Sequence, residues 1–398
     1  MSPAEHCVVV GAGRVGCGFV AERLRAAGHQ VTVVTHTVEQ AEALNRDGGA
    51  RVRLLTRAGA RDVSVAPLEA VPAEDAPTVA RRIAQSSLVA VSVGSRQLAA
   101  VAPLIAPGLA EHRRAVNVLG FENQPDAGAR LRALVAEHAG SVAERHGYAG
   151  VLVDRIVTRQ QDDGGGPVHF VAESRIGAAV DARALIGPLP RVAGLRPVGN
   201  YGAHVLRKLY VFSTGHAATA YLGALHGHRS LAGALDDPEV RAGVVAAMAE
   251  GQAGLAKHYG RAFAGGPERR LAEVARFGVS ALGDTIERVG RDPLRKLGPA
   301  DRIVGPALLA ADAGIPPMTL AVVAAAALHF AARDPLLSRQ LRDDGVPALL
   351  ERYAGLPAGS PFARLVDRAW TLGLDTTSIA AVRAALTDDV GGTLLQAS

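Results

Sequence analysis

Short runs of apolar residues alternate along the first 120 residues with segments whose apolar positions recur at helical spacing. The runs show no polar alternation, so each predicts a strand buried on both faces of a parallel sheet. These runs are residues 7–10, 31–34, 88–94 and 115–120. The helices expected between or after them are residues 14–27, 38–46, 79–83 and 96–105. Strand alternating with helix is typical of a doubly wound α/β sheet.

The pattern changes in the second half of the chain. Residues 152–157 and 168–173 are strand-like, and two short runs within 51–72 predict strands of a local insertion. From about residue 204 the spacing is helical with Pro and Gly breaks, and the apolar segment 319–332 follows a proline pair that signals a helix start. The predicted domains are an N-terminal, doubly wound α/β domain, residues 1–195, and a C-terminal, mostly α-helical domain, residues 196–398.

Composition is ordinary for a globular protein and narrows its partners. Of 398 residues, 48% are hydrophobic and 20% charged, and the formal net charge is +5. The basic residues are scattered, which disfavours nucleic acid and favours anionic small molecules. Cys7 and Cys17 predict neither a disulfide framework nor a zinc site. Because we find no signal peptide and no run long enough to span a bilayer, we expect a cytoplasmic protein without membrane partners.

The first apolar run leads directly into the motif G-x-G-x-x-G, formed by Gly11, Gly13 and Gly16. The first glycine permits a tight turn, the second lets a pyrophosphate approach the backbone, and the third lets the helix pack on the sheet. Arg14 and Val15, which lie between them, are expected to contact the same cofactor. The alternative is a purely structural turn, but the strand before the motif and the helix after it favour a Rossmann-like dinucleotide site.

The choice between NAD and NADP depends on the end of the second strand. An Asp or Glu there would bind the ribose of NAD, but the chain offers Thr35 and His36, with Glu39 slightly late. Hydroxyls and an imidazole favour NADP slightly over NAD, and backbone contacts alone would admit either. Val93 and Gly94, at the end of the third long apolar run, are also expected to line the cofactor site.

A second group of polar residues lies in the helical half. On an α-helix, Lys208, Ser213 and His216 span an arc of about 140°. A lysine with a lowered pKa accepts the proton of an alcohol while a hydride leaves the same carbon. Serine and histidine can bind the reacting oxygen and its neighbour. From these residues alone, a surface lysine and a structural histidine remain the alternative.

The segment RKLYVFSTGHAATAYLG, residues 207–223, resembles the catalytic helix of the mannitol-1-phosphate 5-dehydrogenase group of long-chain polyol (mannitol) dehydrogenases. Mannitol 2-dehydrogenase and the hexuronate reductases belong to the same family. Five further stretches resemble family segments in the same order, and together they cover roughly residues 7–310. These stretches are GAGRVGCGF, LVAVSVG, NVLGFENQ, VDRIV and IERVGRDPLRKLGPADRIVGP.

The resemblance implies metal-independent hydride transfer between NAD(P) and a secondary alcohol of a polyol or polyol phosphate. Lys208 would be the general acid/base, and His216 would assist substrate binding. The family has Asn where this chain has Ser213, and Asn or Asp where it has Gly150. These departures imply a divergent substrate, such as another polyol, a sugar phosphate, a cyclitol or a nucleoside-like alcohol.

Several other polar residues are candidates for the substrate side. Asn123 is expected to touch the nicotinamide ribose or the substrate, and Glu122 either binds substrate or orients its loop. Arg291 and Arg295, with Lys296, offer positive charge to a substrate phosphate, or else cap a helix end.

Two pairs of residues are expected to have no catalytic role. His226 and His228 lack a nearby carboxylate in the sequence, so we do not predict a metal site. Asp154 and Arg155 are expected to form a structural pair at the domain junction.

Two other functions stay open at this point. The cofactor could remain bound and oxidise the substrate transiently, as in an epimerase or cyclase. The chain could also be an inactive dinucleotide-binding regulator, although Lys208 and His216 argue against that. The sequence does not reveal the oligomeric state.

Overall fold

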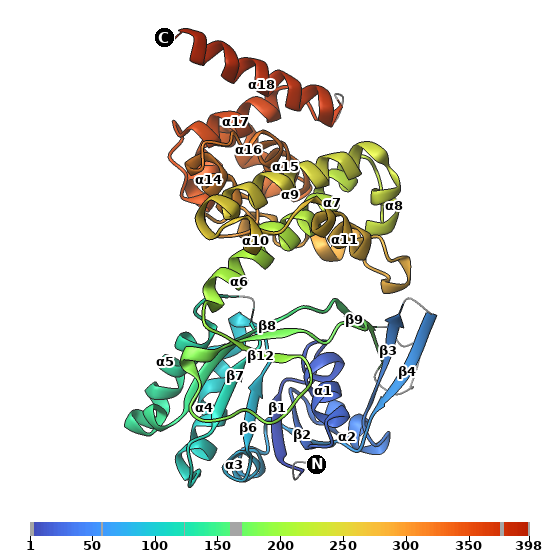
Figure 1. Ribbon diagram of the computed structural model, residues 1–398, viewed down its shortest axis with the longest axis vertical. Helices are drawn as coiled ribbons and strands as arrows, with labels where there is room; N and C mark the ends of the chain where they lie inside the picture. The colour runs from blue at the N-terminus through green and yellow to red at the C-terminus, as the bar shows by residue number, and fades with distance from the viewer. Residues whose placement is uncertain (1–3, 57–58, 123, 160–168, 375–377, 397–398) are drawn as a thin grey trace. The chain divides into compact units, whose positions relative to one another are not determined.

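The computed structural model describes residues 4–56, 59–122, 124–159, 169–374 and 378–396 (Figure 1). The chain divides into two compact units, Met1–Val205 and Leu206–Ser398. The division lies inside helix α6 (Tyr201–Arg207), whereas the sequence places the boundary at residue 195. We call the two parts the N-terminal unit and the helical unit and describe each by itself.

The N-terminal unit contains an eight-stranded sheet with the order β12-β11-β8-β7-β6-β1-β2-β5. The six strands from β5 to β8 in this order are parallel, and β11 runs antiparallel to β8. The chain leaves β1 toward β2 and β5 and then crosses to β6, so the strand order reverses between β1 and β6. The doubly wound sheet is confirmed. Its strands are β1 (His6–Val10), β2 (Gln30–Thr35), β5 (Glu69–Pro72), β6 (Leu88–Val91), β7 (Asn117–Gly120), β8 (Gly147–Val153), β11 (Ala178–Asp181) and β12 (Leu195–Val198).

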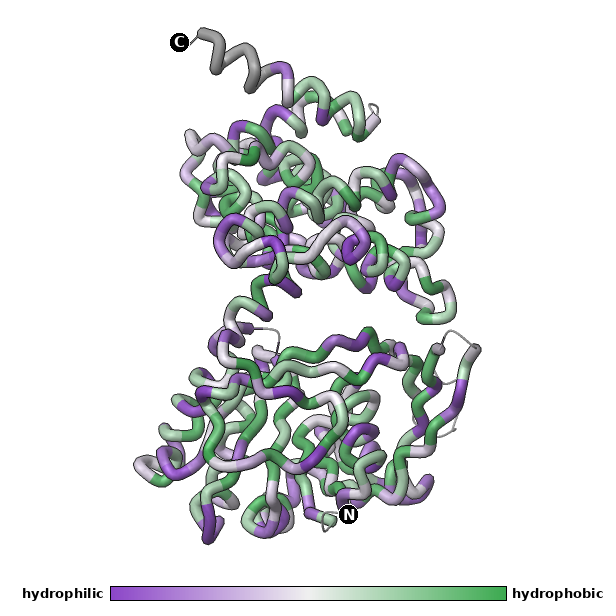
Figure 2. Tube along the Cα trace, in the orientation of Figure 1, coloured by the Kyte–Doolittle hydropathy of each residue, from purple (hydrophilic) through white to green (hydrophobic). Residues whose placement is uncertain are grey.

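Helices cover both faces of this sheet, which explains the unbroken apolar runs. Cys7 and Val9 face a core formed with α1 and α2, while Val8 and Val10 face a core formed with α3, α4 and α5. In Figure 2 the central strands are accordingly mostly hydrophobic along their length. The helices are α1 (Glu22–Ala26), α2 (Val38–Arg46), α3 (Ala76–Ala84), α4 (Leu98–Glu111) and α5 (Ala127–Ala139).

The predicted insertion within residues 51–72 forms part of a second sheet, with the order β4-β3-β10-β9. Its first two strands pair as a hairpin, but β3 also pairs in parallel with β10, more than a hundred residues further along the chain. Residues 69–72 leave this hairpin and join the main sheet as β5. The strands are β3 (Ala50–Thr56), β4 (Gly59–Val65), β9 (Val157–Arg159) and β10 (His169–Glu173).

The helical unit packs around α15 (Met318–Ala331), which starts directly after Pro317 as predicted. Nearly every side chain of α15 is buried, against α7, α9, α17 and α18. Such all-round burial explains an apolar segment without a polar face. Among the described residues, no helix combines the length and apolar character needed to cross a membrane. The main helices are α7 (Thr214–Leu225), α8 (Leu231–Asp236), α9 (Pro238–Tyr259), α10 (Arg261–Ala264), α11 (Pro267–Phe277), α12 (Ile286–Gly290), α13 (Pro293–Lys296), α14 (Val304–Asp312), α16 (Pro335–Ala354), α17 (Pro361–Thr371) and α18 (Ile379–Gln396).

Candidate active site

The three motif glycines have three different surroundings after β1. Gly11 has a φ of +105°, and a Cβ added there would lie 2.8 Å from the carbonyl oxygen of Ser92. A Cβ on Gly16 would lie 1.7 Å from the carbonyl oxygen of Gly11, so no side chain fits. A Cβ on Gly13 would meet no protein atom within 4 Å. Protein packing therefore does not require glycine at position 13, and the open space there fits a pyrophosphate that approaches the backbone.

The helix after this loop begins as a π-helix, η1 (Gly16–Ala21). The amide of Val20 donates to the carbonyl oxygen of Val15 at 2.9 Å, an i→i+5 bond. No side chain caps this helix start, and Gly13 and Arg14 are exposed beside it. Uncapped amides at the start of a helix suit an anion, and the predicted cofactor residues Arg14 and Val15 lie at this helix start.

Arg155 holds the start of this helix in place. Its Nη1 donates to Glu22 Oε2 at 2.9 Å and to the carbonyl oxygen of Gly18 at 3.3 Å. The predicted pairing of Asp154 with Arg155 is wrong, because Asp154 binds Arg175 at 2.8 Å. Consecutive residues of an extended segment point to opposite sides, so the two side chains take different partners.

At the end of β2, the two predicted residues differ in exposure. Thr35 is buried, and its hydroxyl donates to the carbonyl oxygen of Thr37 at 2.8 Å. His36 is exposed. Gln40, in the first turn of α2, donates to the carbonyl oxygen of Ala12 at 3.3 Å and so links this strand end to the glycine loop. Of the pair, His36 is therefore the side chain exposed at the end of this strand.

The loop after β6 is held by Glu122. Gly94, with a φ of +89°, donates its amide to Glu122 Oε1 at 2.8 Å, and Val93 beside it is half-buried. Burial raises the pKa of Glu122 to about 7, although the amides of Gly94 and Ser95 and the charge of Arg130 lower it. This geometry gives Glu122 a role in orienting the loop. Asn123 lies outside the described residues.

The space expected for a polar side chain at position 150 is filled by Tyr201. A Cβ added to Gly150 would lie 2.8 Å from the Tyr201 hydroxyl and 2.8 Å from its ring. The Tyr201 hydroxyl is buried and has no hydrogen-bond partner among the described residues. Burial raises the pKa of Tyr201. No sequence signal links positions 150 and 201, so the sequence did not predict that Tyr201 packs against Gly150.

In the helical unit, Lys208 and Ser213 are the two ends of a second π-helix, η5 (Lys208–Ser213). The amide of Thr214 donates to the carbonyl oxygen of Leu209, five residues earlier. A π turn holds more residues than an α-helical turn, so it reduces the angle between residues five apart. His216 follows three residues after Ser213, which is neighbour spacing on α7. All three predicted residues are half-buried.

His216 is fixed by a buried carboxylate. Its Nε2 lies 3.2 Å from Asp284 Oδ2, and Arg288 holds Asp284 with two further hydrogen bonds. Burial lowers the pKa of His216, and the Asp284 carboxylate opposes this shift. The histidine is therefore neutral near pH 7 with its proton on Nε2, which leaves Nδ1 as an acceptor. Asp284 is 68 residues from His216, a distance at which sequence spacing gives no signal.

The three cations proposed to bind a substrate phosphate differ in exposure and in the partners that they bind. Arg291 is exposed. Arg295 is exposed but pairs with Asp301 at 2.9 Å. Lys296 is buried, and its Nζ donates to the carbonyl oxygen of Val289. Burial, with help from neighbouring arginines, lowers the pKa of Lys296 to about 7. Lys296 therefore links α13 to α12 from a buried position.

The histidines His226 and His228 do have a carboxylate near them, contrary to the sequence expectation. Asp237 lies 2.8 Å from His226 and 3.4 Å from His228. Desolvation raises the pKa of Asp237, but hydrogen bonds from the two histidines and from amides at the start of α9 outweigh it and hold this pKa at about 2. In the part of the chain that the structure describes, no group of three His, Cys, Asp or Glu residues has the arrangement of a metal site.

Comparisons with known proteins agree with this division into units. The family model of the mannitol dehydrogenase Rossmann domain matches residues 5–192, and that of the mannitol dehydrogenase C-terminal domain matches residues 200–371. A structure of Pseudomonas fluorescens mannitol 2-dehydrogenase, a ternary complex with NAD and D-mannitol, has a TM-score of 0.77 at 17% identity, covering 97% of this chain and 95% of that one. A structure of D-sorbitol dehydrogenase in substrate-free form has a TM-score of 0.73 at 16% identity, covering 96% of this chain and 94% of that one. At such identities the likeness concerns the fold.

Proposed function

Because this chain belongs to the mannitol dehydrogenase family, as the matches to both domain models show, we propose that it transfers a hydride between a nicotinamide dinucleotide and a secondary alcohol of a polyol. The resemblance seen in the sequence is thereby confirmed at the level of the family. The observation that supports the proposal comes from the helical unit, where Lys208 and Ser213 are the two ends of a π turn and a buried carboxylate binds His216.

The three side chains have separate tasks in this reaction. Lys208, in its neutral form, accepts the hydroxyl proton as the hydride leaves the same carbon. Ser213 donates a hydrogen bond to the reacting oxygen. His216, neutral and with Nδ1 as its available acceptor, receives a hydrogen bond from a neighbouring hydroxyl of the substrate. The bound nicotinamide supplies hydride acceptance, and no metal ion takes part in this scheme.

The glycine loop fits the pyrophosphate of either cofactor, and NADP is favoured slightly. Residues 35–37 at the end of β2 contain no carboxylate to bind a ribose diol, and His36 is exposed there. The compared mannitol 2-dehydrogenase binds NAD, so the assay covers both. A higher kcat/KM with NADP supports the preference, and a higher value with NAD reverses it.

For the substrate, an unphosphorylated polyol is favoured over a polyol phosphate. Lys296 is buried and the exposed Arg295 is paired with Asp301, which leaves Arg291 as the exposed cation of the group that binds no carboxylate among the described residues. One exposed arginine is a weak phosphate site, because phosphate recognition usually combines several charge-assisted hydrogen bonds. A panel of sugar alcohols, ketoses and their phosphates, followed by the absorbance of the reduced nicotinamide, decides between them.

The test of the mechanism is substitution of Lys208 by Ala and by Arg. Loss of a general acid/base lowers the rate by roughly 10²–10⁴-fold. Lys208→Arg keeps the positive charge but cannot release its proton near neutral pH. We expect both variants to lose turnover and to bind the dinucleotide as the parent does. Turnover retained in Lys208→Ala overturns the assignment, and turnover retained in Lys208→Arg alone shows that only the charge is needed.

A further inference from the structure

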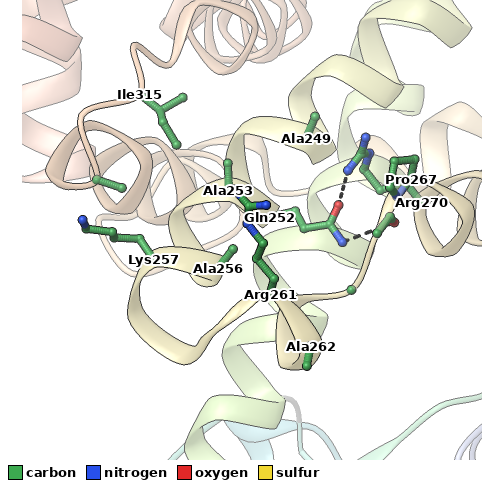
Figure 3. A pocket seen from close by; sticks show the side chains of 13 residues that line it. Ala249, Gln252, Ala253, Ala256, Lys257, Arg261, Ala262, Pro267, Arg270 and Ile315 are labelled. Atoms are coloured by element: carbon green, nitrogen blue, oxygen red, sulfur yellow. Dashed lines mark hydrogen bonds between the residues drawn. The ribbon is translucent and has the colours of Figure 1, made fainter.

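A pocket of about 880 Å³ lies in the helical unit, lined by α9, the turn between α10 and α11, and the segment after α14 (Figure 3). Its lining residues are distinct from every residue of the candidate active site. The apolar part of its wall comes from alanines of α9 and from Ile315. The polar part comes from Gln252, Lys257, Arg261 and Arg270.

The charge of this pocket has a single sign. Lys257, Arg261 and Arg270 line it, and no Asp or Glu is among its lining residues. Within the described ranges, neither Lys257 nor Arg261 forms an ion pair. Two carboxylates lie beside lining residues: Glu268 Oε2 is 3.0 Å from where a Cβ on Gly266 would stand, and Asp312, next to Ala313, pairs with His258 at 3.1 Å. Three cations with no lining carboxylate attract an anion.

One of the cations is held in position and has hydrogen-bonding capacity to spare. The buried Gln252 accepts a hydrogen bond from Arg270 Nη1 through Oε1, and its Nε2 donates to the carbonyl oxygen of Ala264 at 2.9 Å. Figure 3 shows this link between Arg270 and Gln252 at the pocket wall. Arg270 Nε is buried without a hydrogen-bond partner among the described residues. A guanidinium that is already oriented loses little entropy when it binds a ligand.

The backbone at the pocket fixes the shape of its wall. Gly265 has a φ of +89°, and a Cβ there would stand 3.2 Å from Gln252 Nε2, so the turn needs glycine at this position. α11 starts at Pro267 in the pocket wall, but Pro267 has no amide hydrogen and Glu268 lies in the first turn. This helix start therefore does not add to the attraction for an anion.

From the three cations on its wall, the Arg270 guanidinium held by Gln252 and the lack of an Asp or Glu among its lining residues, we infer that this pocket binds the phosphate group of a small molecule. Arginine forks match phosphate oxygens in geometry and in charge. The alanine-lined part of the pocket leaves room for a short organic portion attached to that phosphate. The site does not depend on the proposed dehydrogenase reaction, because none of its residues takes part in it.

Isothermal titration calorimetry of the full chain with inorganic phosphate, at constant ionic strength, tests the inference. We expect Arg261→Gln/Arg270→Gln to weaken phosphate binding by about tenfold or more, as loss of charge-assisted hydrogen bonds does. Ala253→Glu keeps both arginines but places a carboxylate on the wall, and it should weaken binding similarly. This second variant keeps the test valid if the double variant fails to fold.

Arg339→Gln/Arg342→Gln is the matched control, because it removes two exposed arginines of α16, in the same unit but outside the pocket and the candidate active site. Phosphate binding in this control should equal that of the parent. The inference is overturned if the parent binds no phosphate, if binding survives both pocket variants, or if the control removes it. These outcomes are separate from turnover, so they do not bear on the role of Lys208.

Discussion

Placing a methyl group at position 150 should destabilise the N-terminal unit through one identified contact. A Cβ on Gly150 would lie 2.8 Å from the ring and hydroxyl of Tyr201, closer than real Cβ atoms approach other atoms. The ring packs against Leu152, Ala179 and Val205, so it cannot move aside without disturbing that cluster. Overpacking of this kind costs about 1–3 kcal/mol, and we expect Gly150→Ala to lower the free energy of unfolding by that amount.

Gly120 provides a matched control on the neighbouring strand, since Gly120 and Gly150 are register partners. A Cβ on Gly120 would meet its nearest atom at 3.7 Å, an ordinary contact. Neither glycine has positive φ, so alanine is compatible with both backbones. We expect Gly120→Ala to be neutral, or to stabilise by up to about 1 kcal/mol as removal of a strand glycine does.

A double-mutant cycle assigns the cost to Tyr201. In a Tyr201→Ala background the methyl group at position 150 has room, so Gly150→Ala should cost little, with a coupling energy of about 1 kcal/mol or more. Urea unfolding followed by far-UV circular dichroism measures the four variants. An equal cost of Gly150→Ala in both backgrounds would refute the reasoning. Tyr201→Phe should not destabilise, because it removes a buried hydroxyl that has no partner.

Two further predictions concern the cofactor side of the N-terminal unit. Gly13→Ala should leave the unfolding midpoint unchanged but weaken dinucleotide binding in a titration. Gly16→Ala should lower the free energy of unfolding by about 3 kcal/mol or more, because its Cβ would overlap the carbonyl oxygen of Gly11. Equal stability of the two variants would contradict this. Burial raises the pKa of Glu122 from 4.5 to about 7, so the folded chain binds this proton more tightly than the unfolded chain and loses stability as pH rises from about 4.5 to 7. Glu122→Gln keeps an acceptor for the amide of Gly94 and should remove this pH-dependent loss of unfolding free energy, which is on the order of 1–3 kcal/mol. If plots of unfolding free energy against pH for parent and variant stay parallel over this range, the prediction is contradicted.

Much of the fold could be predicted because its signals are local. A strand covered on both faces needs an unbroken apolar run, and 7–10, 31–34 and 88–91 show one. The glycine motif could be predicted for the same reason, because the turn and the close approach belong to consecutive residues. The edge strand β12 and its neighbour β11 were not predicted; β12 is half exposed, and its sequence LRPV has no apolar run.

The parts that could not be predicted depend on contacts between distant residues. Asp284 fixes His216 and Glu22 binds Arg155, but neither pair has a spacing rule. The burial of Lys296 was also hidden, because RDPLRKL is a strongly charged stretch in the sequence. A charge pattern tells how many cations a segment has, and only packing tells which of them face solvent.

The two π-helices show why helical spacing predicted Lys208 and Ser213 but not their alignment. At 100° per residue they lie about 140° apart, and an α-helix would turn the hydroxyl away from the amine. The i→i+5 bonds of η5 remove most of that angle by adding one residue to a turn. One extra residue in a turn shifts the apolar positions that follow by a single place. Irregularities of that size are common in helical apolar patterns, so the sequence does not reveal the π turn. π-Helices are rare, yet η1 follows the glycine loop and η5 carries the proposed acid/base. Their recurrence at these two places argues that the extra residue serves the placement of ligand-facing groups rather than packing.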